Sequence, residues 1–201
     1  MGEEGDIYRR IALAIVQLKA LEKLWDRPRG ASLRSRLRAY NALVLPVLLY
    51  NVVTWGVSQQ LTQKLEVAHR HHLRRILGVQ WPYKISNKNL YERCSAEPIG
   101  TALRRYRWNL FGHVLRLAPT TPAQIAIDFY CDVRDSNKQR GRAHTTLPVL
   151  LFNEYHSFKQ HRKPSKYRQK ADVAVRELRK LASNRKGWAT LVKDVCAAIV
   201  A

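Results

Sequence analysis

Apolar side chains recur every three or four residues along almost the whole chain, which is the spacing of amphipathic helices. Asp6, Ser32 and Ser86 are predicted helix N-caps. Gly78 is predicted to end a helix, and Pro46 to kink or interrupt one. The pattern predicts helices over residues 7–25, 33–55, 58–77, 87–95, 103–117, 147–158 and 170–201. No segment alternates as a β-strand does, so the predicted fold class is all-α.

The same pattern divides the chain into three predicted parts. A helical bundle is expected over residues 1–118 and a helical C-terminal extension over residues 147–201. Residues 119–146 are expected to connect them, ending in a polar, basic loop at 134–146. Within the extension, residues 159–170 hold six Lys or Arg and no acid, which fits either a flexible basic linker or a nucleic-acid-binding tail.

The predicted helix over residues 103–117 places two arginines inside its apolar arc. Burying a guanidinium without a partner costs roughly several kcal/mol of desolvation free energy. No acid lies between Glu97 and Asp128, so Arg104 and Arg107 either find a distant partner or a phosphate, or extend their head groups into water. The predicted apolar seam holds Leu103, Tyr106, Trp108, Leu110, Phe111, Val114, Leu115 and Leu117, and the polar side holds Arg105, Asn109, Gly112, His113 and Arg116.

The charge of the chain changes this picture most. It has 36 Lys plus Arg against 15 Asp plus Glu, a net charge of +21, while 46% of its residues are hydrophobic. The apolar content indicates a folded protein, and such a charge opposes compaction unless a polyanion binds. Nucleic acid is the first candidate partner, and an acidic protein or an acidic membrane surface is the alternative.

Targeting and redox signals point to an intracellular protein. The apolar run over residues 42–53 is interrupted by Pro46 and Asn51 and is too short to cross a bilayer, and the acidic N-terminal sequence is unlike a signal peptide. No membrane partner is therefore expected. Three cysteines without paired spacing indicate reduced thiols, and the expected location is the nucleus or a cytoplasmic ribonucleoprotein. The cysteines are Cys94, Cys131 and Cys196.

Acid-free, arginine-rich stretches are the candidate phosphate-binding sites. No carboxylate lies between Asp26 and Glu66, and like charges four residues apart on a helix, as at Arg34 and Arg38, repel unless an anion intervenes. Such side chains favour salt-dependent binding to phosphates with little sequence preference. The candidate binding residues are Arg34, Arg36, Arg38, Arg70, Arg74, Arg75, Arg104, Arg105 and Arg107, with Arg140 and Arg142 in the basic loop.

Aromatic side chains are candidates for stacking on bases. Trp81 and Tyr83 flank a proline in a predicted loop and are the best placed, with Tyr106 also available. Core packing is the more probable role for the other tryptophans considered, which are Trp25, Trp108 and Trp188.

Metal binding and catalysis receive little support from the sequence. His69 and His72 are spaced to chelate a metal, but no cysteine or carboxylate with zinc-site spacing accompanies them. The arginines around them favour a basic, nucleic-acid-facing stripe or a solvated face. Cys94, Cys131, His113 and His144 match no ligand spacing either, and no phosphate-binding glycine loop occurs. We expect no cofactor and no metal.

Five motifs follow one another along the chain, at residues 6–25, 36–55, 65–79, 104–117 and 181–195, and YNALVLPVLLY and WNLFGHVLR are the most specific parts of them. Together they resemble the region immediately C-terminal to the polymerase palm of LINE-like (non-LTR) retrotransposon reverse transcriptases. The resemblance implies a thumb-like bundle and an extension that hold template RNA and the primer–template duplex during target-primed reverse transcription. The chain departs from that pattern at Asn51, where glycine is usual, and at residues 141–147, where a Gly-Arg-Pro-Arg motif is usual.

The sequence therefore predicts a nucleic-acid-binding fragment of such a reverse transcriptase, and not an enzyme in its own right. A polymerase needs carboxylates that converge on two metal ions, and the chain has no Asp-Asp pair. Met1 falls where the resemblance places the end of the palm, so a palm is an expected partner. The alternatives are a domesticated helical adaptor that docks on a protein or ribonucleoprotein, and a translated remnant without selected function.

Overall fold

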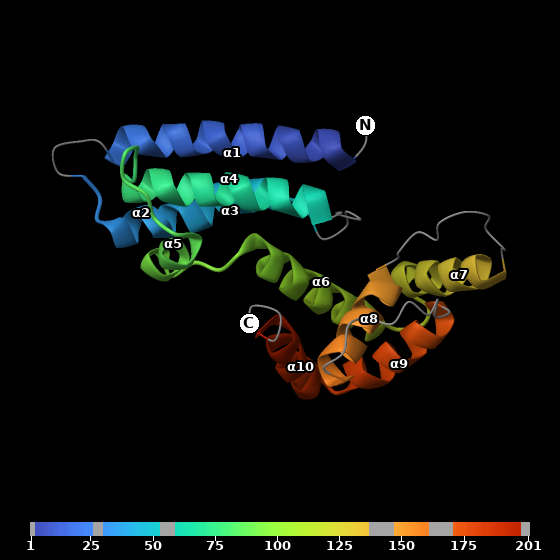
Figure 1. The fold of residues 1–201 in the computed structure, drawn as a ribbon. Coiled ribbons are helices and arrows are strands. Elements are labelled where there is room, and N and C mark those ends of the chain that lie inside the picture. The colour runs from blue at the N-terminus through green and yellow to red at the C-terminus, as the bar shows by residue number, and fades with distance from the viewer. Residues whose placement is uncertain (1–2, 26–29, 53–58, 137–146, 161–170, 198–201) are drawn as a thin grey trace. The chain divides into compact units, whose positions relative to one another are not determined.

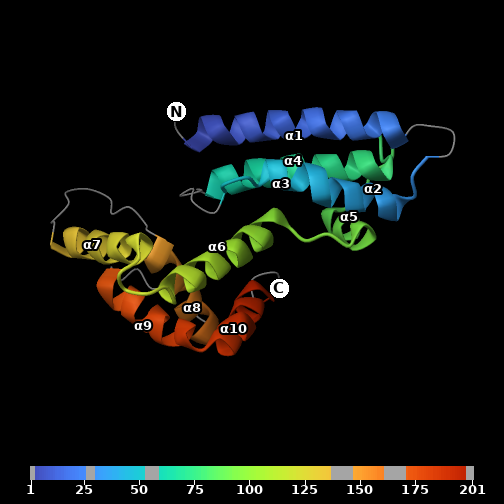
Figure 2. The same ribbon diagram turned by 180° about the vertical axis from the view of Figure 1, so that it is seen from behind.

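The computed structural model describes residues 3–25, 30–52, 59–136, 147–160 and 171–197, and it confirms the all-α class. Within these residues the regular elements are all helical. The chain divides into two compact units, Met1–Leu103 (unit 1) and Arg104–Ala201 (unit 2). The predicted first part extended further, to residue 118. Figures 1 and 2 show the helices of each unit from opposite sides.

Unit 1 is built around two long helices. Its core joins α1 to η1, α3 and α4, and includes Ile7, Leu18, Tyr40 and Leu73. Asp6, a predicted N-cap, instead lies inside α1, where it pairs with Arg10 at 3.4 Å (Asp6 Oδ1 to Arg10 Nε), so that prediction was wrong. The elements are α1 (Glu3–Trp25), α2 (Leu33–Ala39), η1 (Tyr40–Val44), α3 (Leu45–Leu48), α4 (Gln59–Leu77), α5 (Asn87–Cys94) and the beginning of α6 (Ile99–Leu115).

The predicted interruption at Pro46 takes the form of a π-helical turn. Pro46 lies in the first turn of α3 and has no N–H to donate to the preceding turn. The helical turn before it is wider than an α-helical turn, and the Leu45 N–H donates to the Tyr40 carbonyl five residues back. The chain thus continues in one direction through the proline, and Tyr40 and Val44 remain in the core.

Local capping signals are confirmed in unit 1. The Ser32 hydroxyl accepts a hydrogen bond from the Ser35 N–H at 3.3 Å, and the Ser86 hydroxyl accepts one from the Asn89 N–H at 3.2 Å. Gly78, at φ +69°, ends α4 in the left-handed conformation that glycine adopts without strain. These caps depend on neighbouring residues only, which is why the sequence predicted them correctly.

Unit 2 consists of α6 from Arg104 onward and four further helices around a second core. Trp108, Phe111, Leu151, Leu178 and Trp188 are among its buried side chains. Part of the predicted connecting segment is helical. This helix, α7, begins at Pro122, and proline is favoured at the first position of a helix. The further helices are α7 (Pro122–Ser136), α8 (Leu147–Gln160), α9 (Ala171–Ser183) and α10 (Arg185–Ala197).

The buried face of α6 differs from the predicted seam. Tyr106 and Leu110 are about two-fifths exposed, whereas Gly112, predicted on the polar side, is buried. A Cβ atom on Gly112 would lie 2.9 Å from Trp188 Cδ1 and closer still to two other indole atoms. α6 therefore presents Gly112 to the indole of α10, and the apolar face turns to include this contact.

Candidate nucleic-acid interface

Arg34 and Arg38 of α2 are the most accessible of the predicted phosphate-binding arginines within the described residues. Arg34 and Arg38 are exposed, and neither is paired with a carboxylate among the described residues. Arg36 is partly buried, and its Nε donates to the Ala31 carbonyl at 2.8 Å, which fixes the guanidinium near the start of the helix. α2 thus presents two unneutralised cations to solvent, one turn apart.

The three arginines of α4 are largely engaged inside unit 1. Arg70 Nη1 lies 3.5 Å from Glu66 Oε1, and Arg75 pairs with Glu22 of α1. Arg74 donates to the Asn87 side-chain carbonyl of α5 at 2.7 Å, a contact that leaves its charge unneutralised. Of this group, Arg74 alone has no carboxylate partner within the described residues, and it lies at the end of α4 that faces α5.

The prediction that His69 and His72 share a basic stripe or a solvated face with the arginines of α4 is wrong. His69 and His72 are only 2% and 1% exposed, and Tyr40 Oη lies 2.8 Å from His69 Nδ1 and 3.4 Å from His72 Nδ1. Burial, as the largest cause, lowers the pKa of each to about 4, so both are neutral near pH 7. Burial also raises the pKa of Tyr40, which keeps its hydroxyl proton available for hydrogen bonding.

A signal for this burial is present in the sequence. Leu65, His69, His72, Leu73 and Ile76 recur at four, three, one and three residues, and all are buried on one face of α4. Arg70, Arg74 and Arg75 lie between these positions and are partly exposed. His71, by contrast, is exposed.

The loop between α4 and α5 carries the predicted stacking residues at its surface. Trp81 is 87% exposed and Tyr83 is 80% exposed, whereas Trp25, Trp108 and Trp188 are buried as predicted. A cavity of about 480 Å³ lies beside the loop. Its lining includes Gly78, Tyr83, Lys84, Ser86, Asn89 and Arg93, and no acidic side chain.

The arginines of α6 have internal contacts. Arg104 Nε lies 3.3 Å from Glu154 Oε1 of α8, and the Trp108 indole N–H donates to the other oxygen of Glu154 at 2.8 Å. Arg105 lies over the Tyr106 ring at 5.7 Å, and Arg107 is partly buried. Of the alternatives that the sequence left open for Arg104, the structure shows a distant partner, a carboxylate fifty residues away. Arg140 and Arg142 lie outside the described residues.

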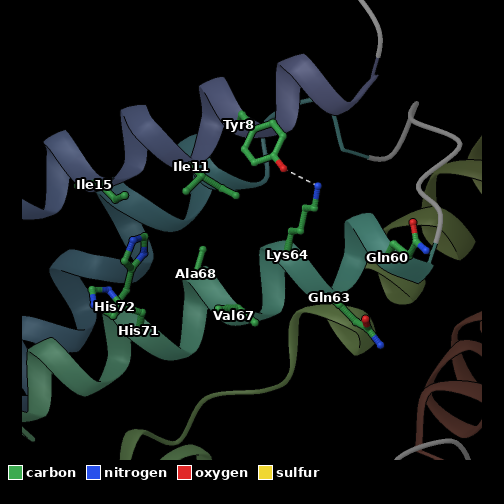
Figure 3. A pocket seen from close by; sticks show the side chains of 10 residues that line it. All are labelled: Tyr8, Ile11, Ile15, Gln60, Gln63, Lys64, Val67, Ala68, His71 and His72. Carbon is green, nitrogen blue, oxygen red and sulfur yellow. Dashed lines mark hydrogen bonds between the residues drawn. The ribbon is translucent and has the colours of Figure 1, made fainter. Parts of the chain in front are cut away.

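An apolar groove, which the sequence did not predict, runs between α1 and α4 (Figure 3). It encloses about 650 Å³, and Ile11, Ile15, Val67 and Ala68 line it. At one side Lys64 donates to the Tyr8 hydroxyl and to Glu4. The volume of the groove is within the range of ligand-binding pockets, and its lining also includes Gln60, Gln63 and His71.

The remaining sequence predictions concern metal binding, the cysteines and membrane-spanning helices. Nowhere in the described part of the chain do three His, Cys, Asp or Glu side chains gather as they would around a metal ion. Cys94, Cys131 and Cys196 are buried. Among the described helices, none has the length and hydrophobicity needed to cross a bilayer.

Comparison with other proteins leaves the geometry as the main guide to function. No protein-family model, no curated protein and no solved structure matches the chain.

Proposed function

We propose that the chain binds nucleic acid through backbone phosphates, and that unit 1 acts as a thumb-like bundle of a LINE-like reverse transcriptase. In that role it holds template RNA and the primer–template duplex, and it carries out no polymerisation itself. The net charge of +21 and the five sequence motifs support this proposal. A nuclear or ribonucleoprotein location would follow from the same role.

One observation carries the proposal. α2 and α5 both pack against α4 and lie toward the same end of unit 1 in Figures 1 and 2. The residues between Asp26 and Glu66, and those between Glu66 and Glu92, include no acid. We call this region the basic end of unit 1. Its cations are Arg34, Arg38, Arg74, Lys84, Lys88 and Arg93, and Glu92 is an exposed acid on α5 beside them.

The basic end fits a phosphate backbone better than a compact acidic ligand. Its cations come from three helices and the loop between α4 and α5, so a polyanion that extends over the surface can reach several of them at once. Each phosphate contact releases condensed counterions, so the affinity should fall steeply with salt. No base-specific geometry is required, and binding should vary little with sequence.

Replacing Arg34 and Arg38 by glutamine tests this surface without breaking an ion pair. Fluorescence anisotropy with labelled DNA duplex and RNA–DNA hybrid, at several salt concentrations, measures the affinity and its salt dependence. For DNA duplex, losing two phosphate contacts should reduce the slope of log K against log salt by about 2. Arg70 and Arg75 are poor test positions, because their loss would break contacts that hold unit 1 together.

A matched control removes the same charge elsewhere. Lys186 and Lys193 are exposed on α10 of unit 2, and their replacement by glutamine should leave the slope almost unchanged. If the two double variants behave alike, binding follows net charge and not the basic end, and the assignment of the site fails.

The groove between α1 and α4 favours a second candidate function, an adaptor that docks on a protein partner. Apolar side chains line much of the groove, and one of them, Val67, is well exposed. Exposed apolar surface of this kind is typical of a site that a protein partner covers. If the chain binds no nucleic acid at physiological salt, this adaptor function becomes the better-supported one.

A further inference from the structure

The loop over residues 78–86 keeps two aromatic rings in water. Trp81 and Tyr83 are the two most exposed of the large hydrophobic side chains in the described residues. Elsewhere in those residues the tryptophans are in the cores, since burying such a ring is strongly favourable. Two accessible rings two residues apart indicate a surface that a ligand covers.

The backbone of this loop is fixed at three points. The Val79 N–H donates to the Arg74 carbonyl at 3.0 Å, which completes the C-terminal cap of α4. The Tyr83 N–H donates to the Gln80 carbonyl at 2.9 Å and closes a turn that has Trp81 inside it. Ser86 then caps α5. Because the backbone is already ordered, a ligand that binds the rings loses little affinity to ordering the loop.

Charge beside the rings selects the ligand. Tyr83 lines the cavity of about 480 Å³ together with Lys84, Asn89 and Arg93, and no carboxylate lines it. Its size is within the range of small-ligand sites, and its polar groups include two cations and an amide. An aromatic face next to cations matches a base attached to a phosphate.

We propose that this loop binds the unpaired bases of single-stranded RNA or DNA. Trp81 and Tyr83 stack on bases, and Lys84 and Arg93 contact the neighbouring phosphates. In a duplex the base faces are covered by their neighbours, so the rings gain little from a duplex. The inference rests on the proposed nucleic-acid binding and adds the strand type, since the loop would favour the single-stranded part of a template over its paired part.

The test replaces both rings in the full chain, as W81A/Y83A. The ligands are a mixed-sequence 12-nucleotide RNA and the same strand annealed to its DNA complement, each labelled for anisotropy at one salt concentration. Since base–aromatic stacking contributes strongly to such binding, the single strand should bind about 10-fold to 100-fold more weakly. The hybrid should change by less than about 2-fold, on the same reasoning.

Two control variants separate stacking from other effects. W81F/Y83F keeps aromatic rings at both positions and should retain most of the single-strand affinity. Phe129 on α7 is an exposed aromatic side chain of unit 2, and Phe129→Ala should leave both affinities unchanged. Because Trp81 and Tyr83 are almost fully accessible, their loss should not unfold unit 1, and circular dichroism checks this.

Tryptophan fluorescence gives a direct second readout. Stacking on a base quenches indole emission, so the single strand should quench the wild-type chain more than Trp81→Phe. Equal quenching of both proteins, or equal weakening of single strand and hybrid by W81A/Y83A, would overturn the proposal. Unchanged affinity for both ligands would also overturn it and would favour a protein partner on the rings.

The outcome is distinguishable from failure of the phosphate-binding surface. If R34Q/R38Q does not change the salt slope but W81A/Y83A still weakens single-strand binding, the assignment of the basic end is contradicted and the stacking loop remains supported. If R34Q/R38Q changes the salt slope but W81A/Y83A does not weaken single-strand binding, only the proposal for the loop is contradicted.

Discussion

A histidine cluster in unit 1 and an ion pair in unit 2 hold polar side chains in two different ways. Unit 1 encloses His69 and His72 beside Tyr40 as a neutral, hydrogen-bonded cluster. Unit 2 instead pairs Arg104 with Glu154, which also accepts the Trp108 indole proton. Protonation destabilises the histidine cluster, because it places a charge in the core. Removing one partner destabilises the ion pair, because the other charge then has no counter-charge.

The same comparison explains which arginines remain accessible. Arg104 on α6 has no acid nearby in the sequence, yet folding brings Glu154 to it. Arg34 and Arg38 on α2 also lack a local acid, and no described carboxylate reaches them. The density of arginine along a helix is therefore a poor guide to binding. Whether a distant carboxylate folds onto the helix decides the matter.

The largest expected effect is a loss of stability of unit 1 in acid. His69 and His72 have folded-state pKa values of about 4, below the usual value of 6.5, so the unfolded chain takes up more protons between pH 6.5 and 4. Stability should therefore fall as pH falls through this window, by about 3 kcal/mol for each histidine at most. Hydrogen exchange measured by mass spectrometry between pH 7 and 4 would follow each unit separately.

Neighbouring histidines provide the control for that profile. His72→Leu should remove about half of the pH dependence, because one buried titrating group is lost. His71→Leu should change the profile far less, since His71 is exposed and affects His72 only through its charge. Equal acid sensitivity of these two variants would contradict the role of the buried cluster.

A smaller effect is expected from breaking the polar contacts of unit 2. Glu154→Ala leaves the Arg104 guanidinium and the Trp108 N–H without their shared acceptor. The loss should be about 2 kcal/mol, less than for a fully buried pair because both charged side chains are about one-fifth exposed. Denaturant unfolding would measure it. Glu177→Ala, on the exposed side of α9, should cost less than about 0.5 kcal/mol.

The smallest effect should come from α2. R34A/R38A removes two exposed cations that repel each other, so the free energy of unfolding should change by less than about 0.5 kcal/mol or rise slightly. The same urea titration that measures Glu154→Ala would show it. A loss as large as that of Glu154→Ala would mean that the α2 arginines hold unit 1 together, and the contrast between the two helices would disappear.

Much of the secondary structure follows from the sequence, because its signals are local. Ser32, Ser86 and Gly78 act on the backbone within four residues of themselves, and all three work as predicted. Pro46 likewise disturbs the turn that precedes it. The candidate site was only partly predictable: Trp81 and Tyr83 were found in their exposed loop, while Arg70 and Arg75 turned out to have internal partners.

The sequence by itself determined the helical period, the caps and the excess of positive charge. Only the tertiary structure decided which way each helix faces. Gly112 is buried because the Trp188 indole fits against its bare Cα, and His69 and His72 are buried because Tyr40 offers a hydroxyl beside them. Arg104 is paired because α8 brings Glu154 within 3.3 Å. Helical periodicity depends on neighbours a turn away, but these choices depend on partners tens of residues distant, and only folding brings such partners together.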